Sequence, residues 1–179
     1  MTKKIICIIP ARSGSKGIPG KNIKILNHKP LIQYSFETAV KSKLFDKIVL
    51  STDSNEIAEV GKKIGLEAPF LRPIEIATDE TPMIDVIKHT INFFSESYNP
   101  DIICILQPTS PFRDVKDLIK GHKLILNEEC DSVVSVEKIP SQYSPYSAMK
   151  IINDKLELLI KSDKPVTRRQ DLEDIYLRS

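Results

Sequence analysis

The sequence predicts an α/β fold in three layers, a mostly parallel sheet covered by helices on both faces. Two observations support this prediction. The apolar runs at residues 4–9 and 101–106 show no polar alternation, which is typical of strands buried on both faces. Segments of helical period separate such runs, and this alternation implies right-handed crossovers between parallel strands. With 179 residues, the chain is long enough for one domain with a sizeable core.

The first half of the chain begins with the strand at residues 4–9, followed by a loop from Pro10 to about Asn27. Pro30 opens a helix, because proline fits a first helical turn and apolar residues follow it at helical spacing. Residues 47–51, Lys-Ile-Val-Leu-Ser, form the second strand.

Two further helices follow the second strand. Ser54 or Asn55 can cap the first of them, and Gly65 can end it. Thr81-Pro82 predicts the start of the other, with a capping hydroxyl and then a proline in the first turn.

The next strand covers residues 101–106, and Asp114 caps a helix that runs to about Asn127. Residues 132–136 are expected to add a further strand to the sheet. After about Pro140 the pattern changes to a polar, proline-broken loop and then a β-hairpin turning at Asn153-Asp154. We interpret residues 140–166 as an arm added to the sheet and a candidate dimerisation element.

Composition excludes several classes of protein. Lys and Arg number 26 against 24 Asp and Glu, and this net charge of +2 is too mild to indicate nucleic-acid binding. No run approaches the ~20 apolar residues of a membrane span. Cys7 and Cys104 lie in apolar runs, so we interpret them as small hydrophobic residues. The three cysteines show no metal spacing, and a reducing cytoplasm is the simplest context.

Polar or charged residues follow three strands, at residues 12–22, 51–53 and 107–113. Ligands of open α/β sheets bind beyond the carboxyl ends of the strands, so we expect all three segments to line one crevice. The first combines glycines with Arg12 and two lysines, which favours an anion cradle of backbone N–H groups and cations.

The first loop differs from the common phosphate-binding motifs. Gly14 and Gly20 are one residue too far apart for G-x-x-x-x-G-K-[ST], and Asn22 replaces its Ser or Thr. No G-x-G occurs, which excludes the dinucleotide fingerprint. The loop is therefore a phosphate cradle of a third kind, and the alternative is a flexible basic surface loop.

The chain resembles the acylneuraminate cytidylyltransferases, the CMP-sialic acid synthetase family with its legionaminic and pseudaminic acid relatives. The first loop, I-I-P-A-R-S-G-S-K-G-I-P-G-K-N, carries the resemblance together with L-Q-P-T-S-P-F-R at residues 106–113. Supporting motifs follow in family order: L-S-T-D at residues 50–53, L-R-P at 71–73, A-T-D at 77–79, D-S-V-V-S-V at 131–136 and R-R-Q-D-L at 168–172.

The resemblance implies a Rossmann-like nucleotidyltransferase fold of the nucleotide-diphospho-sugar transferase type and a homodimer built with the arm. It implies that CMP passes from CTP to the anomeric hydroxyl of a nine-carbon 2-keto acid sugar, with release of pyrophosphate. Mg²⁺ is the implied cofactor, and the biosynthesis of cell-surface polysaccharide is the implied setting. Such a reaction depends on charge neutralisation and in-line positioning rather than covalent catalysis.

The resemblance also implies roles for individual residues. Arg12 and Lys21 are the candidate catalytic residues. The candidate nucleotide-binding residues are Arg12, Ser13, Gly14, Ser15, Lys16, Lys21, Asn22, Arg72 and Thr81. Of these, Asn22 is expected near the nucleoside and Arg72 near the cytosine. The candidate sugar-binding residues share the loop after the strand at residues 101–106 and are Gln107, Thr109, Ser110 and Arg113.

Two residues of the strand-end loops, Arg113 and Asp53, could have structural roles instead of roles in binding. Arg113 could pair on the surface with Asp114 or Asp117 instead of binding a sugar. Asp53 could be an ordinary turn or cap residue.

Family members continue past R-R-Q-D-L into a segment whose D-x-D-type pair holds magnesium. This chain contains no D-x-D, so we expect residues 1–179 to be one cytidylyltransferase domain that is incomplete at its C-terminus, with apolar surface left exposed. Its metal ligands stay unassigned, although Asp53 could substitute. The alternatives are another sugar nucleotidyltransferase and a non-catalytic nucleotide-binding fragment.

Overall fold

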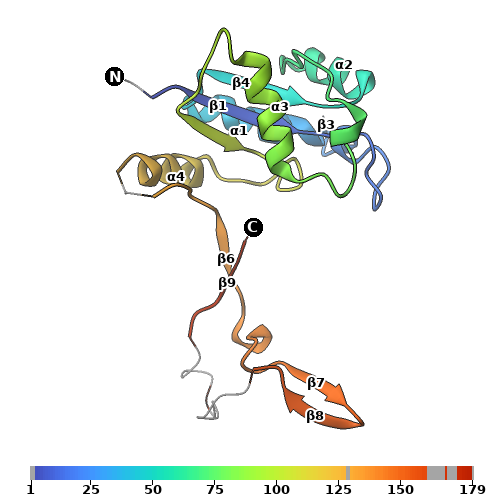
Figure 1. Cartoon of the computed structure of the whole chain (residues 1–179), viewed down its shortest axis with the longest axis vertical. Coiled ribbons are helices and arrows are strands. Elements are labelled where there is room, and N and C mark those ends of the chain that lie inside the picture. Colours follow the sequence, from blue (N-terminus) through green and yellow to red (C-terminus); the bar gives the residue numbers. More distant parts are fainter. Residues whose placement is uncertain (1–2, 128–129, 161–167, 169–172, 179) are drawn as a thin grey trace. The chain divides into compact units, whose positions relative to one another are not determined.

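The computed structural model describes residues 3–127, 130–160, 168 and 173–178. The chain divides into two compact units, Met1–Asn127 and Glu128–Ser179, which we describe separately. The first unit contains the α-helices and the parallel sheet, and the second contains short antiparallel strands and a 3-10 helix (Figure 1).

A parallel sheet forms the centre of the first unit. Within the described residues its strand order is β4-β1-β5, formed by β1 (Ile5–Pro10), β4 (Lys47–Ser51) and β5 (Ile102–Ile105). Both neighbours of β1 run parallel to it, with Cys7 opposite Ile48 on one side and Cys104 on the other. The apolar runs therefore form the parallel strands that the sequence predicts. Among the described residues β1 is buried almost throughout, whereas β5 is only partly buried and its Ile103 is 39% exposed, so the full burial expected for residues 101–106 is wrong.

Helices cover both faces of this sheet, which confirms the three-layer arrangement. Alternate residues of β1 face opposite sides, as the period of a strand requires. Cys7 and Ile9 join one core cluster with residues of α1 (Leu31–Ser42) and α2 (Asn55–Lys63), and Leu118 of α4 (Val115–Asn127) packs against it. Ile6 and Ile8 join the other, against Phe94 of α3 (Met83–Phe94). Figure 1 shows α3 crossing the strands.

The helix boundaries follow local sequence signals. α1 begins directly after Pro30. Ser54 caps α2 by accepting a hydrogen bond from the N–H of Ile57 at 3.3 Å, and Gly65 follows that helix with a φ of 85°. Asp114 accepts from the N–H of Lys116 at 2.9 Å, which confirms it as the cap of α4.

The expected capping role of Thr81 is wrong. Pro82 occupies the N-cap position of α3, and no side chain caps this end of the helix. The Thr81 hydroxyl turns backward instead and accepts from the N–H of Thr78 at 3.1 Å. Threonine hydroxyls bond the backbone of turns as readily as that of helix ends, so sequence spacing alone does not separate the two outcomes.

The loop after β1 has more regular structure than expected. A 3-10 helix, η1 (Lys21–Ile23), precedes a small antiparallel pair formed by β2 (Ile25–Leu26) and β3 (Lys29–Pro30). Asn27 and His28 both adopt positive φ at the turn, which suits a tight hairpin connection. A second 3-10 helix, η2 (Ile74–Ile76), lies between β4 and α3.

The second unit corrects the strand expected at residues 132–136. Residues 132–135 form no strand, and β6 (Val136–Lys138) pairs antiparallel with β9 (Tyr176–Arg178). Val133 and Val134 are 40% and 48% exposed, so no layer of the described residues buries this apolar run. Strand preference depends on a sheet neighbour and a covering face, and no strand of the described residues pairs with residues 132–135.

The hairpin of the second unit forms where the sequence predicts it. β7 (Met149–Ile152) pairs antiparallel with β8 (Lys155–Leu158), and Asn153 and Asp154 have φ values of 50° and 61°. Positive φ at both turn positions is the type I′ geometry that Asn and Asp tolerate. A 3-10 helix, η3 (Ser141–Tyr143), precedes the hairpin. Met149, Ile151 and Leu156 are exposed on it.

Candidate functional site

A cleft of 570 Å³ opens at the carboxyl end of the sheet in the first unit, and we call it the basic cleft. The first loop contributes residues 12–16, and Asp53 follows β4. The opposite wall is formed by Ile74, Ala77, Thr78 and Asp79. Two of the three segments that the sequence predicts to converge therefore share this cleft.

The first loop is anchored to β4 at its start. The N–H of Ala11 donates to the carbonyl of Ser51 at 2.9 Å, which continues the strand pairing one residue beyond Pro10. Asp53 then accepts two hydrogen bonds from Ser13, one from its N–H at 2.8 Å and one from its hydroxyl at 2.6 Å. Both donors of Ser13 are engaged by this carboxylate.

Asn22 also holds the start of the first loop in place. Its side chain is buried, and Nδ2 donates to the carbonyl of Arg12 at 2.9 Å. Asn22 lies in η1, so this bond connects the end of the first loop back to its beginning. Neither Asn22 nor Lys21 lines the basic cleft.

Two cations of the cleft converge on one carboxylate. Lys16 Nζ lies 2.6 Å from Oδ2 of Asp79, and the guanidinium of Arg12 pairs with Oδ1 of the same side chain. The hydrogen bonds from Lys16 and from Arg12 hold the pKa of Asp79 below its usual value. Sequence reasoning assigned no role to Asp79, although the A-T-D motif was part of the family resemblance.

Arg72 is a buried arginine that braces β4. Its exposed fraction is 5%, and its guanidinium donates to the hydroxyl of Ser51 at 3.2 Å and to the carbonyl of Ser51 at 2.5 Å. Burial lowers the pKa of Arg72, and the nearby charge of Asp53 opposes that shift. Arg72 is not a lining residue of the basic cleft. Thr81 touches the cleft indirectly, through its hydrogen bond with Thr78.

The third strand-end loop is held by its own contacts. The carbonyl of Gln107 accepts from the Ser35 hydroxyl and from the Arg113 guanidinium, both at 3.3 Å. Thr109 donates to the Gln107 side chain at 3.4 Å. Because β5 is parallel to β1, this loop leaves the same edge of the sheet, but none of its residues lines the basic cleft.

Arg113 folds inward instead of pairing on the surface. It makes no ion pair with Asp114 or Asp117, both of which are described residues, and its Nη1 atom is buried without a hydrogen-bond partner there. Burial lowers the pKa of Arg113, and the neighbouring thiols of Cys104 and Cys7 oppose that shift. The three cysteines are free, and burial raises the pKa of Cys7.

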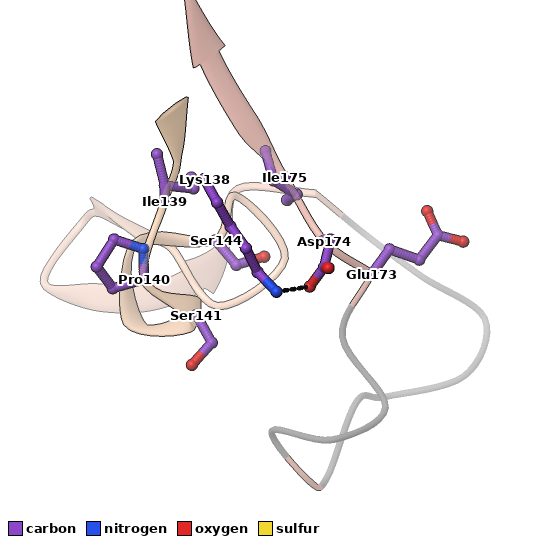
Figure 2. A pocket seen from close by; sticks show the side chains of 8 residues that line it. All are labelled: Lys138, Ile139, Pro140, Ser141, Ser144, Glu173, Asp174 and Ile175. Atoms are coloured by element: carbon purple, nitrogen blue, oxygen red, sulfur yellow. Dashed lines mark ion pairs between the residues drawn. The ribbon is translucent and has the colours of Figure 1, made fainter. Parts of the chain in front are cut away.

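A second cavity of 380 Å³ lies in the second unit. Figure 2 shows its lining, in which Lys138 reaches across to Asp174 and Glu173 points away from that pair. Lys138 Nζ and Asp174 Oδ1 are 2.6 Å apart, so the charge of Lys138 is already neutralised. The cavity brings none of the predicted site residues together.

The described residues do not supply a metal site of their own. No group of three or more His, Cys, Asp or Glu side chains gathers among them in a way that could hold a metal ion. Asp53 and Asp79 share the basic cleft, but Ser13 engages the first, and Arg12 and Lys16 engage the second. In the part of the chain that the structure describes, no helix is long and apolar enough to cross a membrane.

Comparison with known families gives a clear match. The model of the family described as "Cytidylyltransferase" covers residues 6–179. An N-acylneuraminate cytidylyltransferase from Escherichia coli O18:K1:H7 is 41% identical over 145 residues, which are 79% of this chain and 34% of the relative. A pseudaminic acid cytidylyltransferase from Campylobacter jejuni is 37% identical over 178 residues, covering 97% of this chain and 74% of that protein.

The chain thus spans about a third of the length of the Escherichia coli relative. Among solved structures, a CMP:2-keto-3-deoxy-manno-octonic acid synthetase complexed with CTP superposes with a TM-score of 0.70. It is 20% identical, and the match covers 98% of this chain and 70% of that one. At this identity the likeness shows the fold, which is the nucleotidyltransferase type that the sequence predicts.

Proposed function

Because the chain belongs to the cytidylyltransferase family, we propose that it transfers CMP from CTP to the anomeric hydroxyl of a nine-carbon 2-keto acid sugar, releasing pyrophosphate. Relatives named for N-acylneuraminate, pseudaminic acid and N,N'-diacetyllegionaminic acid support this substrate class. The observation that carries the proposal is the convergence of Arg12 and Lys16 on one carboxylate in the basic cleft. Side chains that close on a carboxylate can close equally on a phosphate oxygen.

The basic cleft would take the triphosphate of CTP. Arg12 and Lys21 would neutralise the charge that develops as pyrophosphate leaves, and Lys16 and Ser15 would bind its oxygens. Ser13 and Gly14 would form the backbone of the cradle. In this proposal Asn22 lies near the nucleoside, Arg72 lies near the cytosine, and the Thr81 hydroxyl lies near the nucleotide.

The loop after β5 would bind the sugar. Gln107, Thr109 and Ser110 offer amide and hydroxyl groups for its hydroxyls and carboxylate, and Arg113 would supply the positive charge. The parallel strands bring this loop to the same sheet edge as the first loop, which supports the proposal. That placement would allow the anomeric oxygen to approach the α-phosphate in line.

Mg²⁺ is the proposed cofactor. When bound, it would neutralise phosphate charge, and we assign none of the described residues as its ligand. We propose a homodimer in which residues 140–166 serve as the arm, because Met149, Ile151 and Leu156 expose apolar surface on its hairpin. The three free cysteines are compatible with a reducing cytoplasm as the compartment.

Pyrophosphate release tests the proposal. The chain is incubated with CTP, Mg²⁺ and one of three acceptors, namely sialic, legionaminic or pseudaminic acid. Release that requires one acceptor supports the transfer and identifies the sugar. No release with any acceptor, from folded and soluble protein, would contradict the catalytic proposal for this chain.

Nucleotide choice is tested separately by thermal shift. Stabilisation by CTP but not by ATP, GTP or UTP supports the cytidylyl assignment, because a ligand stabilises the folded state only to the extent that it binds it. Equal stabilisation by all four nucleotides would instead indicate a sugar nucleotidyltransferase of other specificity. CTP binding without turnover would indicate a nucleotide-binding fragment.

A further inference from the structure

Asp53 lines the basic cleft, but no role in binding or catalysis has been assigned to it above. Its carboxylate accepts from the N–H of Ser13 at 2.8 Å and from the Ser13 hydroxyl at 2.6 Å. These two residues are 40 positions apart in sequence, and they join the segment directly after β4 to the third residue after β1. We call this pair of hydrogen bonds the Asp53–Ser13 clamp.

Hydrogen bonds hold the backbone on both sides of Asp53. Asp53 follows Thr52, which is fully buried and whose carbonyl accepts from the N–H of Arg72 at 2.7 Å. The Thr52 hydroxyl accepts from the N–H of Ser54 at 3.2 Å, and Ser54 in turn caps α2. The backbone on both sides of Asp53 is therefore fixed by a buried strand end and a capped helix start.

The clamp determines where the first loop can go. Ser13 is held on one side by Asp53, and its neighbour Arg12 is held on the other through the bond from Asn22. The carbonyl of Ser13 then accepts from the N–H of Ser15 at 2.8 Å, which turns the chain toward Lys16. Of the two cations that pair with Asp79, Arg12 therefore adjoins the clamped Ser13, and Lys16 lies three residues beyond it.

The charge of Asp53 argues against direct contact with a phosphate. A carboxylate beside a polyphosphate repels it, and both Ser13 donors already satisfy this one. We propose that Asp53 is a positioning residue of the triphosphate site, which acts through Ser13 and touches neither nucleotide nor metal. This inference rests on the proposed function, because it assumes that the basic cleft takes a polyphosphate.

Three substitutions separate this role from the alternatives. Asp53→Ala removes the clamp. Asp53→Asn preserves it without the charge, because the amide oxygen can accept from the Ser13 N–H and the amide nitrogen can donate to the Ser13 oxygen. Glu59→Ala, on the exposed face of α2, removes one negative charge elsewhere and serves as the charge-matched control.

Binding to the full chain is measured with three probes: CTP, inorganic tripolyphosphate and cytidine. Asp53→Ala is expected to weaken CTP and tripolyphosphate about tenfold, with cytidine and the melting temperature little changed. Asp53→Asn and Glu59→Ala are expected to stay within about twofold of the unsubstituted chain. Ser13→Ala combined with Asp53→Ala should add little, because both remove the same contact.

Two results would overturn the inference. One is unchanged tripolyphosphate affinity in Asp53→Ala. The other is an equal loss in Asp53→Asn and Asp53→Ala, which would show that the carboxylate charge itself acts on the ligand or on a metal.

A hydrogen-exchange measurement separates this inference from the proposed function. Exchange at the Ser13 amide should accelerate in Asp53→Ala and not in Asp53→Asn, without any nucleotide present. If the unsubstituted chain binds neither CTP nor tripolyphosphate, the proposed function fails, and the polyphosphate role of Asp53 fails with it. If the chain binds both while Ser13 exchange is unchanged in Asp53→Ala, only the clamp is contradicted.

Discussion

Lys16 Nζ lies 2.6 Å from Oδ2 of Asp79, and the Arg12 guanidinium pairs with the other oxygen of that carboxylate. The residues come from two different segments that line the basic cleft, so the ion pairs join these segments. A negatively charged ligand of Arg12 and Lys16 has to replace Asp79 as their partner. Asp79 is thus an internal competitor of the triphosphate that we propose for this cleft.

Asp79→Asn is therefore expected to raise the affinity for CTP and for tripolyphosphate severalfold. The substitution keeps the shape of the side chain and removes the competing charge. The gain should shrink as salt increases, because the Lys16 side chain is 83% exposed and its pair with Asp79 is screened. Isothermal titration at two ionic strengths measures both effects, and a weaker affinity in Asp79→Asn would show that this carboxylate helps to bind the ligand.

The titration of Asp79 provides a check on the same ion pairs. Hydrogen bonds from Lys16, and to a smaller extent from Arg12, lower the pKa of Asp79 in the folded protein. The ion pairs therefore stabilise the folded state fully above the unfolded pKa of about 3.9. This contribution to folding stability is lost as the pH falls through the lower pKa that Asp79 has in the folded protein. We expect Lys16→Ala to raise the pKa of Asp79, as followed by carboxyl NMR. An unchanged pKa would contradict the pairing.

Lys21→Ala is expected to weaken CTP binding at low and moderate salt. Lys21 begins η1 at the far end of the first loop, where its charge would still act on a triphosphate. Lys62→Ala, on the last turn of α2, is the matched control and should leave the affinity unchanged. If the two variants bind CTP equally well, Lys21 is not part of the cradle.

Gly61→Ala should destabilise the first unit by about 1–3 kcal/mol. An added Cβ would lie 2.6 Å from Cδ2 of Leu50 and 2.9 Å from the carbonyl of Leu66, so the core has to shift. The helix preference of alanine offsets this cost by at most about 1 kcal/mol. Gly17→Ala is the control, because its Cβ meets nothing within 4 Å. Urea denaturation compares them, and equal midpoints would contradict the packing described.

The parallel sheet and its helices are predictable from sequence because unbroken apolar runs and helical spacing of apolar residues leave a strong signal. β1, β4 and β5 coincide with apolar runs, and the caps at Ser54 and Asp114 form as their residue types suggest. The strand expected at residues 132–136 is wrong, since its formation depends on neighbours that local sequence does not specify.

The candidate site was predictable in its composition but not in its internal pairing. The first loop and Asp53 share a cleft, as parallel strand ends require. The partners that Arg12, Ser13 and Lys16 find across the cleft are carboxylates distant in sequence, and no local pattern specifies such contacts. The roles of the Gln107–Arg113 loop and of the arm remain predictions.

The central claim is that the basic cleft binds the triphosphate of CTP, and isothermal titration of the chain and its Arg12→Ala variant tests it most directly. We predict saturable binding of CTP in the presence of Mg²⁺, weakened about tenfold or more in Arg12→Ala, with cytidine binding unaffected. Equal affinity of the two proteins for CTP, or no saturable binding of CTP by the unsubstituted chain, would contradict the claim.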